Sequence, residues 1–157
     1  MSIHSTTPKT RKIIEALWKL EKIILDTLDF NVVVQKICDG LLTELDYLEL
    51  GYRIIVLTLV DEDKQVLKRI SLSQTDAAAK AQAASAIPFH QIDIPLDTLD
   101  NLLIKTLKTK KPQITHSWPD IFRPTLTEDQ ARTNQAAAGI KTSMLYPVIV
   151  KNKAIGV

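Results

Sequence analysis

Apolar residues in the first part of the chain recur at steps of three or four positions, which is the spacing of one face of an α-helix. They predict a helix over residues 9–28, after a polar segment over residues 1–8 that we expect to be disordered. One apolar stripe consists of Ile13, Leu17, Leu20, Ile24 and Leu28, and a second stripe beside it consists of Ile14, Trp18 and Leu25. One stripe is enough to dock a helix on its own domain. The second therefore indicates either the interface of a homodimer or a helix buried more deeply in one core.

A second helical pattern begins at Asp29 or Asn31, either of which can cap a helix, and runs to about residue 48. Its wide apolar face consists of Val33, Val34, Ile37, Cys38, Leu41, Leu42 and Leu45. The position of Cys38 on this face predicts a buried, inert thiol rather than a nucleophile or an attachment point for a tetrapyrrole.

The period then changes to that of strands. Residues 52–60 are β-branched and nearly all apolar, which predicts a central strand, and a polar turn over residues 61–64 follows. Residues 66–73 predict the antiparallel partner of this strand. In that partner Arg69, Ser71 and Ser73 alternate with apolar residues and are expected to share one face.

The middle of the chain mixes weak and strong signals. Residues 76–86 are rich in alanine and could form a helix, but they have little bulky apolar surface, so we expect a mobile surface loop or lid. Residues 89–94 predict a short strand that ends at Pro95. Asp97 or Thr98 is expected to begin a helix that carries Leu99, Leu102, Leu103 and Leu107 and ends in the basic run over residues 108–111.

The last third predicts a brief strand over residues 113–115 and then a loop over residues 116–124 with two prolines and two aromatic residues. Thr127 and Gln130 have the spacing of a capping box, which predicts a helix that ends at Gly139. A strand over residues 142–150, a turn over residues 151–153 and a final strand over residues 154–157 complete the pattern.

This order of elements predicts an α+β fold in one domain over residues 9–157. We expect a mostly antiparallel sheet of about six strands, with the N-terminal helices on one face and lid helices or loops over the other. The sequence stops within an apolar strand, whereas natural domains tend to end in exposed polar segments. We therefore expect a domain that is truncated before a C-terminal helix.

Composition excludes several classes of protein. The 157 residues carry a net charge of +2 and only 5% are aromatic, so the basic stripe with aromatic residues that typifies nucleic-acid binding is missing. No apolar run reaches the roughly 20 residues that cross a bilayer, and charged residues interrupt what would be a signal-peptide core. We expect a cytoplasmic protein that neither enters a membrane nor binds nucleic acid.

Four segments, taken in order, resemble the GAF domain family over nearly the whole chain. The segments are residues 28–37, residues 52–63, residues 94–96 with 103–114, and residues 139–157. The last is the most specific, because Pro147 and Gly156 stand where the closing hairpin of the family ends one strand and eases the next.

This resemblance implies a small-molecule-sensing and dimerising input domain of a signal-transduction protein. In such proteins an output domain follows the sensor, most often a histidine kinase of a two-component system or a diguanylate cyclase. The resemblance also leaves open a structural dimerisation module without a ligand. Enzymes of this fold that reduce methionine sulfoxide need several cysteines, so we expect no catalysis from this chain. Its one cysteine does not stand where bilin-carrying members attach their chromophore, and we expect no bilin.

Candidate ligand residues fall into two groups. His116, Trp118 and Phe122 lie on the aromatic loop, which would close over a pocket together with the lid over residues 76–90 and 116–139, or would only cover the edge of the sheet. The polar strand residues are Arg69, Ser71 and Ser73 with Ser143 and Tyr146 on the closing strand. If they line a cavity, Arg69 would meet an anionic ligand; if they face water, they form a solvated surface. No two histidines have the spacing of a metal pair, so we expect no metal and treat His90 and His116 as ordinary histidines rather than haem ligands.

Overall fold

The structure, a computed structural model, describes residues 34–35, 38–40 and 52–157. Residues 34–35 and 38–40 are helical, as the second helical pattern predicts. The predicted disordered tail, the first helix and its proposed dimer residues Ile14, Trp18 and Leu25 lie outside the described residues.

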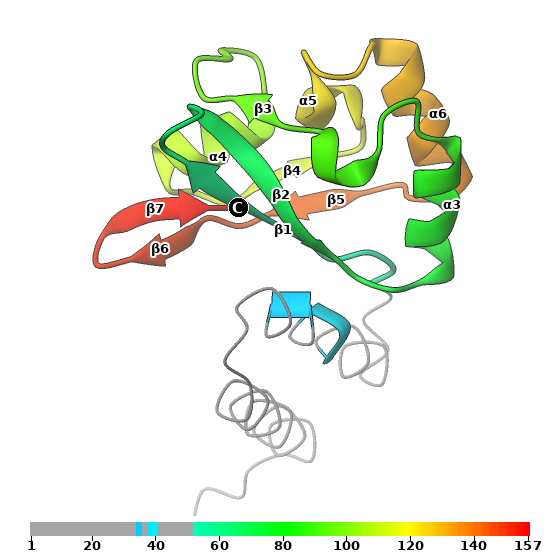
Figure 1. Cartoon of the computed structure of the whole chain (residues 1–157), viewed down its shortest axis with the longest axis horizontal. Coiled ribbons are helices and arrows are strands. Elements are labelled where there is room, and N and C mark those ends of the chain that lie inside the picture. The colour runs from blue at the N-terminus through cyan, green and yellow to red at the C-terminus, as the bar shows by residue number, and fades with distance from the viewer. Residues whose placement is uncertain (1–33, 36–37, 41–51) are drawn as a thin grey trace, which may run out of the picture.

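Within the described residues, seven strands form two antiparallel sheets, in agreement with the predicted α+β class (Figure 1). The larger sheet has the order β3-β2-β1-β7-β6, and the smaller sheet pairs β4 with β5. Their bounds are β1 Val56–Asp61, β2 Val66–Leu72, β3 Ile94–Pro95, β4 Gln113–Thr115, β5 Ser143–Leu145, β6 Val148–Val150 and β7 Lys153–Gly156. The predicted single strand over residues 142–150 is divided at Pro147, because proline has no N–H to donate to a ladder. Its two halves pair in different sheets.

The helices over residues 76–138 cover the sheet on the side opposite residues 34–35 and 38–40 (Figure 1). Their bounds are α3 Asp76–Ala84, the 3-10 turn η1 Phe89–Gln91, α4 Leu102–Thr109, α5 Pro119–Phe122 and α6 Glu128–Ala138. The predicted capping box of α6 is confirmed, and Gly139 ends this helix in the left-handed conformation. None of these helices combines the length and the apolar character that a membrane-spanning helix requires.

Three predictions about the middle of the chain are wrong. The segment expected to be a surface loop is the helix α3, which packs on α6. Its alanines let the two helices approach closely, and Ala78 is 1% exposed. The expected strand over residues 89–94 is mostly the turn η1, in which Gln91 N–H donates to the Pro88 carbonyl.

The start of α4 also differs from the prediction. Asn101 caps this helix, since its side chain accepts hydrogen bonds from the N–H groups of Leu103 and Ile104. Leu99, which was expected on the apolar face, precedes the helix and is 92% exposed. Asp97 and Thr98 could serve as caps by residue type, but only the packed position of Asn101, itself 1% exposed, decides where the helix begins.

Two apolar clusters fill the space between the sheet and the helices. One, under α4, consists of Leu67, Ile94, Leu103, Ile104 and Leu145. The other, which we call the aromatic cluster, consists of Ile92, Trp118, Phe122, Leu126, Ala131 and Ala138. The aromatic loop is therefore part of the core rather than a cover over the edge of the sheet.

Candidate functional site

A β-bulge in the hairpin β1–β2 separates residues that were expected to share a face. Leu57 pairs with Ser71 and Thr58 pairs with Arg69, which leaves Ile70 without a partner residue. Because successive residues of a strand point to opposite faces, the extra residue sends Arg69 and Ser71 to opposite sides of the sheet. The prediction of one shared face is wrong for these two residues.

Arg69 lies on the side of the helices and is almost completely enclosed. The residue is 6% exposed, and its guanidinium carbon lies 4.5 Å from the ring centre of Phe122 and 5.5 Å from that of Phe89. Burial lowers the pKa of Arg69 to about 10, and the Asp93 carboxyl opposes this shift. The guanidinium therefore keeps its charge at neutral pH, and of the two alternatives for the polar strand residues the solvated surface is wrong for Arg69.

Two buried polar atoms, one on Arg69 and one on Asp93, have no hydrogen-bond partner. The Nε of Arg69 donates to the Ile92 carbonyl at 3.2 Å, but its Nη2 is buried and makes no hydrogen bond. The Oδ1 of Asp93, the residue that follows Ile92, is also buried without a partner. Unpaired buried polar atoms are uncommon, since each costs about 1–3 kcal/mol. A donor and an acceptor are thus left open in one small region, which we call the Arg69 site.

Ser71 lies on the opposite side and joins the sheet to the N-terminal helical residues. Its hydroxyl donates to Gln35 Oε1 at 2.9 Å, and Gln35 Nε2 donates to the Leu72 carbonyl at 2.7 Å. Cys38, 4% exposed, also lies here, and burial raises the pKa of its thiol more than a hydrogen bond with Ser71 lowers it. The predicted burial of Cys38 is confirmed. Ser73 accepts from the Ile55 N–H at 2.9 Å and so serves the backbone.

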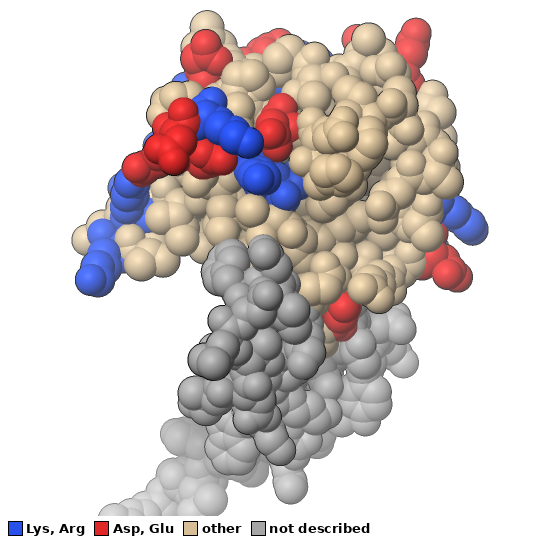
Figure 2. Space-filling view, viewed as in Figure 1, with Lys and Arg blue, Asp and Glu red and all other residues tan. Residues whose placement is uncertain are grey.

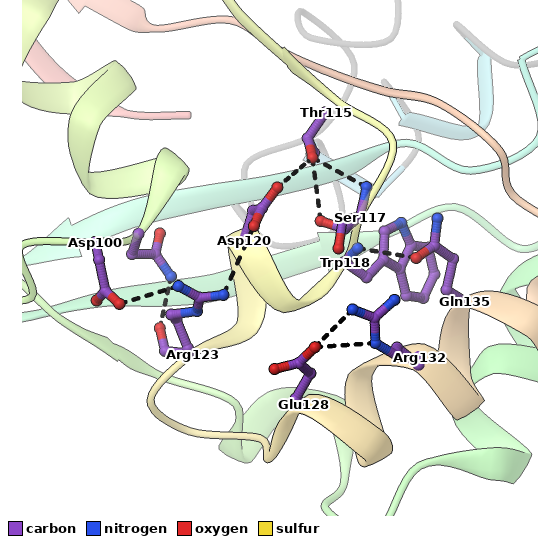
Figure 3. Close-up of polar contacts among 10 residues, drawn as sticks. Asp100, Thr115, Ser117, Trp118, Asp120, Arg123, Glu128, Arg132 and Gln135 are labelled. Carbon is purple, nitrogen blue, oxygen red and sulfur yellow. Dashed lines mark hydrogen bonds and ion pairs between the residues drawn. The ribbon is translucent and has the colours of Figure 1, made fainter.

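The aromatic loop is held in place by hydrogen bonds to the last third of the chain. The indole Nε1 of Trp118 donates to Ser143 Oγ at 3.0 Å. The backbone N–H of Trp118 donates to Gln135 Oε1 at 2.9 Å (Figure 3). The rings of Trp118 and Phe122 are 5.3 Å apart and tilted by 43°. Ser143 thus orients Trp118, and Phe122 covers the Arg69 guanidinium.

A chain of polar contacts fixes the other side of α5. Thr115 Oγ1 donates to Asp120 Oδ2 at 2.6 Å, and Asp120 lies 3.7 Å from Arg123 (Figure 3). Arg123 also donates to Asp100 at 3.0 Å. These groups are partly exposed, so they orient the loop more than they stabilise it.

Two predicted ligand residues lie apart from the Arg69 site. His116 is exposed, and its Nδ1 lies 3.0 Å from Thr142 Oγ1. Tyr146 is 53% exposed, because it falls just before Pro147, where the chain leaves β5. Conversely, sequence reasoning missed Phe89 and Asp93, which approach Arg69 from 20 and 24 residues further along the chain. No pattern in the sequence indicates that approach.

The surface of the described chain has two features of note, a group of charged turns and an open depression. Figure 2 shows charges of both signs gathered where the turns β1–β2 and β6–β7 lie, and Lys153 there pairs with Glu62 at 2.5 Å. An open depression of about 340 Å³ lies between the end of β2 and α3, and Arg69 does not line it. In the described part of the chain no three His, Cys, Asp or Glu residues are grouped so that they could hold a metal ion.

No protein-family model and no curated protein matches this sequence. Solved structures do. Residues 122 to 287 of a methyl-accepting chemotaxis protein match at 18% identity and a TM-score of 0.56, over 87% of this chain and 74% of that one. The nlh2 GAF domain of A. aeolicus, in an inactive state, matches at 13% identity and a TM-score of 0.56, over 94% of this chain and 77% of that one.

The GAF domain of an Acinetobacter phosphoenolpyruvate-protein phosphotransferase matches at 10% identity and a TM-score of 0.54, over 92% of this chain and 73% of that one. At these identities the likeness concerns the fold. The described chain therefore has a GAF-like fold, as the sequence resemblance predicts.

Proposed function

We propose that this chain is the small-molecule-sensing domain of a cytoplasmic signalling protein, and that its ligand contacts Arg69 beneath Phe89 and Phe122. One observation carries the proposal: a buried, charged guanidinium has an Nη2 without a partner. Burying a polar group without a hydrogen bond is costly, and an acceptor on a ligand would remove that cost.

Phe89 and Phe122 together cover the Arg69 guanidinium, and both lie on short elements. Phe89 lies on η1, a turn of three residues, and Phe122 ends α5, a helix of four residues. Phe122 is anchored in the aromatic cluster, whereas Phe89 is only partly buried. Because a turn of three residues has few internal hydrogen bonds to break, Phe89 is the part of the cover that can move at low cost and admit a ligand. The buried contacts of Trp118 and Ser143 then give the loop a defined closed position.

The fold supports a regulatory role. One structure with this fold belongs to a methyl-accepting chemotaxis protein, and two others are described as GAF domains. We extend the proposal to a homodimer formed through the first helix and to an output domain of the histidine kinase type in the parent protein. A structural dimerisation module without a ligand is the alternative, and the open Nη2 of Arg69 argues against it.

Native mass spectrometry of the purified chain tests this function, because it reports both the number of subunits and any retained small molecule. We expect a small added mass on the wild-type chain and its loss in Arg69→Met. Arg132→Met is the matched control, since Arg132 is an exposed arginine that pairs with Glu128 on the same helix. Circular dichroism checks that each variant is folded. Retention of the same mass by a folded Arg69→Met chain would contradict the proposal, and so would a chain that never retains or binds a small molecule.

A further inference from the structure

The open donor and the open acceptor of the Arg69 site belong to two residues that meet where the Arg69 side chain reaches the segment of Ile92 and Asp93. The Arg69 Nε is bonded to the carbonyl of Ile92, the residue next to Asp93, and the Asp93 carboxyl acts electrostatically on the guanidinium. Even so, no ion pair within 4.0 Å joins Arg69 and Asp93 among the residues that the structure describes. Each residue therefore has one buried polar atom without a hydrogen bond: Arg69 Nη2 can donate to an acceptor, and Asp93 Oδ1 can accept from a donor.

We propose that the ligand carries a carboxylate and an ammonium group on neighbouring atoms, as an α-amino acid does. This inference rests on the proposed sensing function. The carboxylate would accept from Arg69 Nη2, and the ammonium group would donate to Asp93 Oδ1. Both bonds involve charged groups and are stronger than neutral hydrogen bonds.

The charges at the site disfavour a bare anion. Arg69 and Asp93 carry opposite charges, so together they contribute no net charge. An inorganic anion such as sulfate would satisfy Arg69 but would leave the Asp93 oxygen unpaired and close to a like charge. A simple amine would leave Arg69 unpaired in the same way. Of these three kinds of ligand, the one that carries both groups satisfies both open atoms.

The position of Asp93 is fixed from outside the site. Its backbone carbonyl accepts from Thr125 Oγ1, on the segment between α5 and α6. The rings of Phe89 and Phe122 lie over the Arg69 guanidinium, and Ile92 packs in the same apolar cluster as Phe122. A ligand with an apolar side chain therefore fits these walls better than one with a second charge, because an additional charge would be buried without a partner.

Thermal unfolding of the 157-residue chain with the common α-amino acids as probes tests this assignment. We expect at least one apolar α-amino acid to raise the melting temperature, because a ligand that binds only the folded state stabilises it. Two analogues of that amino acid serve as matched probes: the 2-hydroxy acid, which lacks the ammonium group, and the amine, which lacks the carboxylate. Both analogues are expected to bind at least about tenfold more weakly, the ratio that corresponds to one lost charged hydrogen bond.

Two variants separate the contributions of the two residues. Asp93→Asn should abolish the preference for the amino acid over its 2-hydroxy acid, while Arg69→Met should abolish binding of both. The comparison of analogues on the wild-type chain remains decisive if a variant does not fold. If sulfate or the 2-hydroxy acid binds as tightly as every amino acid, the proposed ligand class is wrong, but the sensing function still stands. If no probe binds and the purified chain carries no added mass, the sensing function itself fails.

Discussion

Replacing Gly156 by alanine is expected to pull the last strand, β7, away from the centre of the sheet. A Cβ at this position would lie 2.1 Å from the Thr58 carbonyl oxygen and 2.7 Å from Leu59 Cδ2. A Cβ essentially never lies within 3.0 Å of another heavy atom to which it is not bonded. The two strands must therefore separate by roughly 1 Å to make room for it. The obstacle is a backbone carbonyl, which cannot rotate away as a side chain would.

The separation places three hydrogen bonds at risk. The Thr58 N–H donates to the Val157 carbonyl at 2.9 Å, the Val157 N–H donates to Thr58 O at 3.0 Å, and Thr58 Oγ1 donates to Val157 O at 2.9 Å. At a net contribution of about 0.5–1.5 kcal/mol each, their loss amounts to about 3 kcal/mol. For a domain of this size that free energy corresponds to a fall in melting temperature of roughly 6–12 °C.

Urea unfolding followed by circular dichroism measures this free energy directly. Gly139→Ala is the control, because its Cβ would meet only the end of the Arg53 side chain, at 3.4 Å. The positive φ of Gly139, +66°, makes that substitution cost about 1 kcal/mol for backbone reasons alone. If Gly156→Ala is no more destabilising than Gly139→Ala, the last strand yields freely and the reasoning from the close contact is wrong.

Three further predictions concern single side chains. Thr127→Ala should lower the free energy of unfolding by about 1 kcal/mol, because it removes the N-cap of α6; Thr127→Ser should restore it, and urea unfolding checks both. Trp118→Phe and Ser143→Ala should each cost about 1 kcal/mol, and a double-mutant cycle should show that the costs are not additive, since both remove the hydrogen bond from the indole to the hydroxyl. Full additivity would mean that this bond contributes nothing. Burial raises the pKa of the Cys38 thiol, so iodoacetamide should alkylate the folded chain far more slowly than the chain in urea. The stability that this thiol contributes is complete below its pKa in the unfolded chain and falls as the pH rises through the folded value, so it is lost on the alkaline side; equal alkylation rates would contradict the burial.

Elements with strong local signals could be predicted from the sequence. The pairing of β1 with β2, the capping box of α6 and the end of that helix at Gly139 all follow from residues close together in the chain. The alanine-rich segment could not be predicted in the same way. The small side chains of α3 give it little apolar surface of its own, and it becomes a helix because α6 offers a surface that only small side chains can approach closely.

The candidate site likewise has features that the sequence predicts and features that it does not. The sequence by itself determined that Arg69 stands on a strand of apolar neighbours, and that Trp118 and Phe122 share one loop with two prolines. Only the tertiary structure decided that Arg69 faces the helices while Ser71 faces the N-terminal residues, because one extra residue in β2 reverses the alternation of the strand. It also brought Phe89 and Asp93 to the guanidinium. Such approaches depend on how loops distant in sequence pack over a sheet, and no local periodicity carries that information.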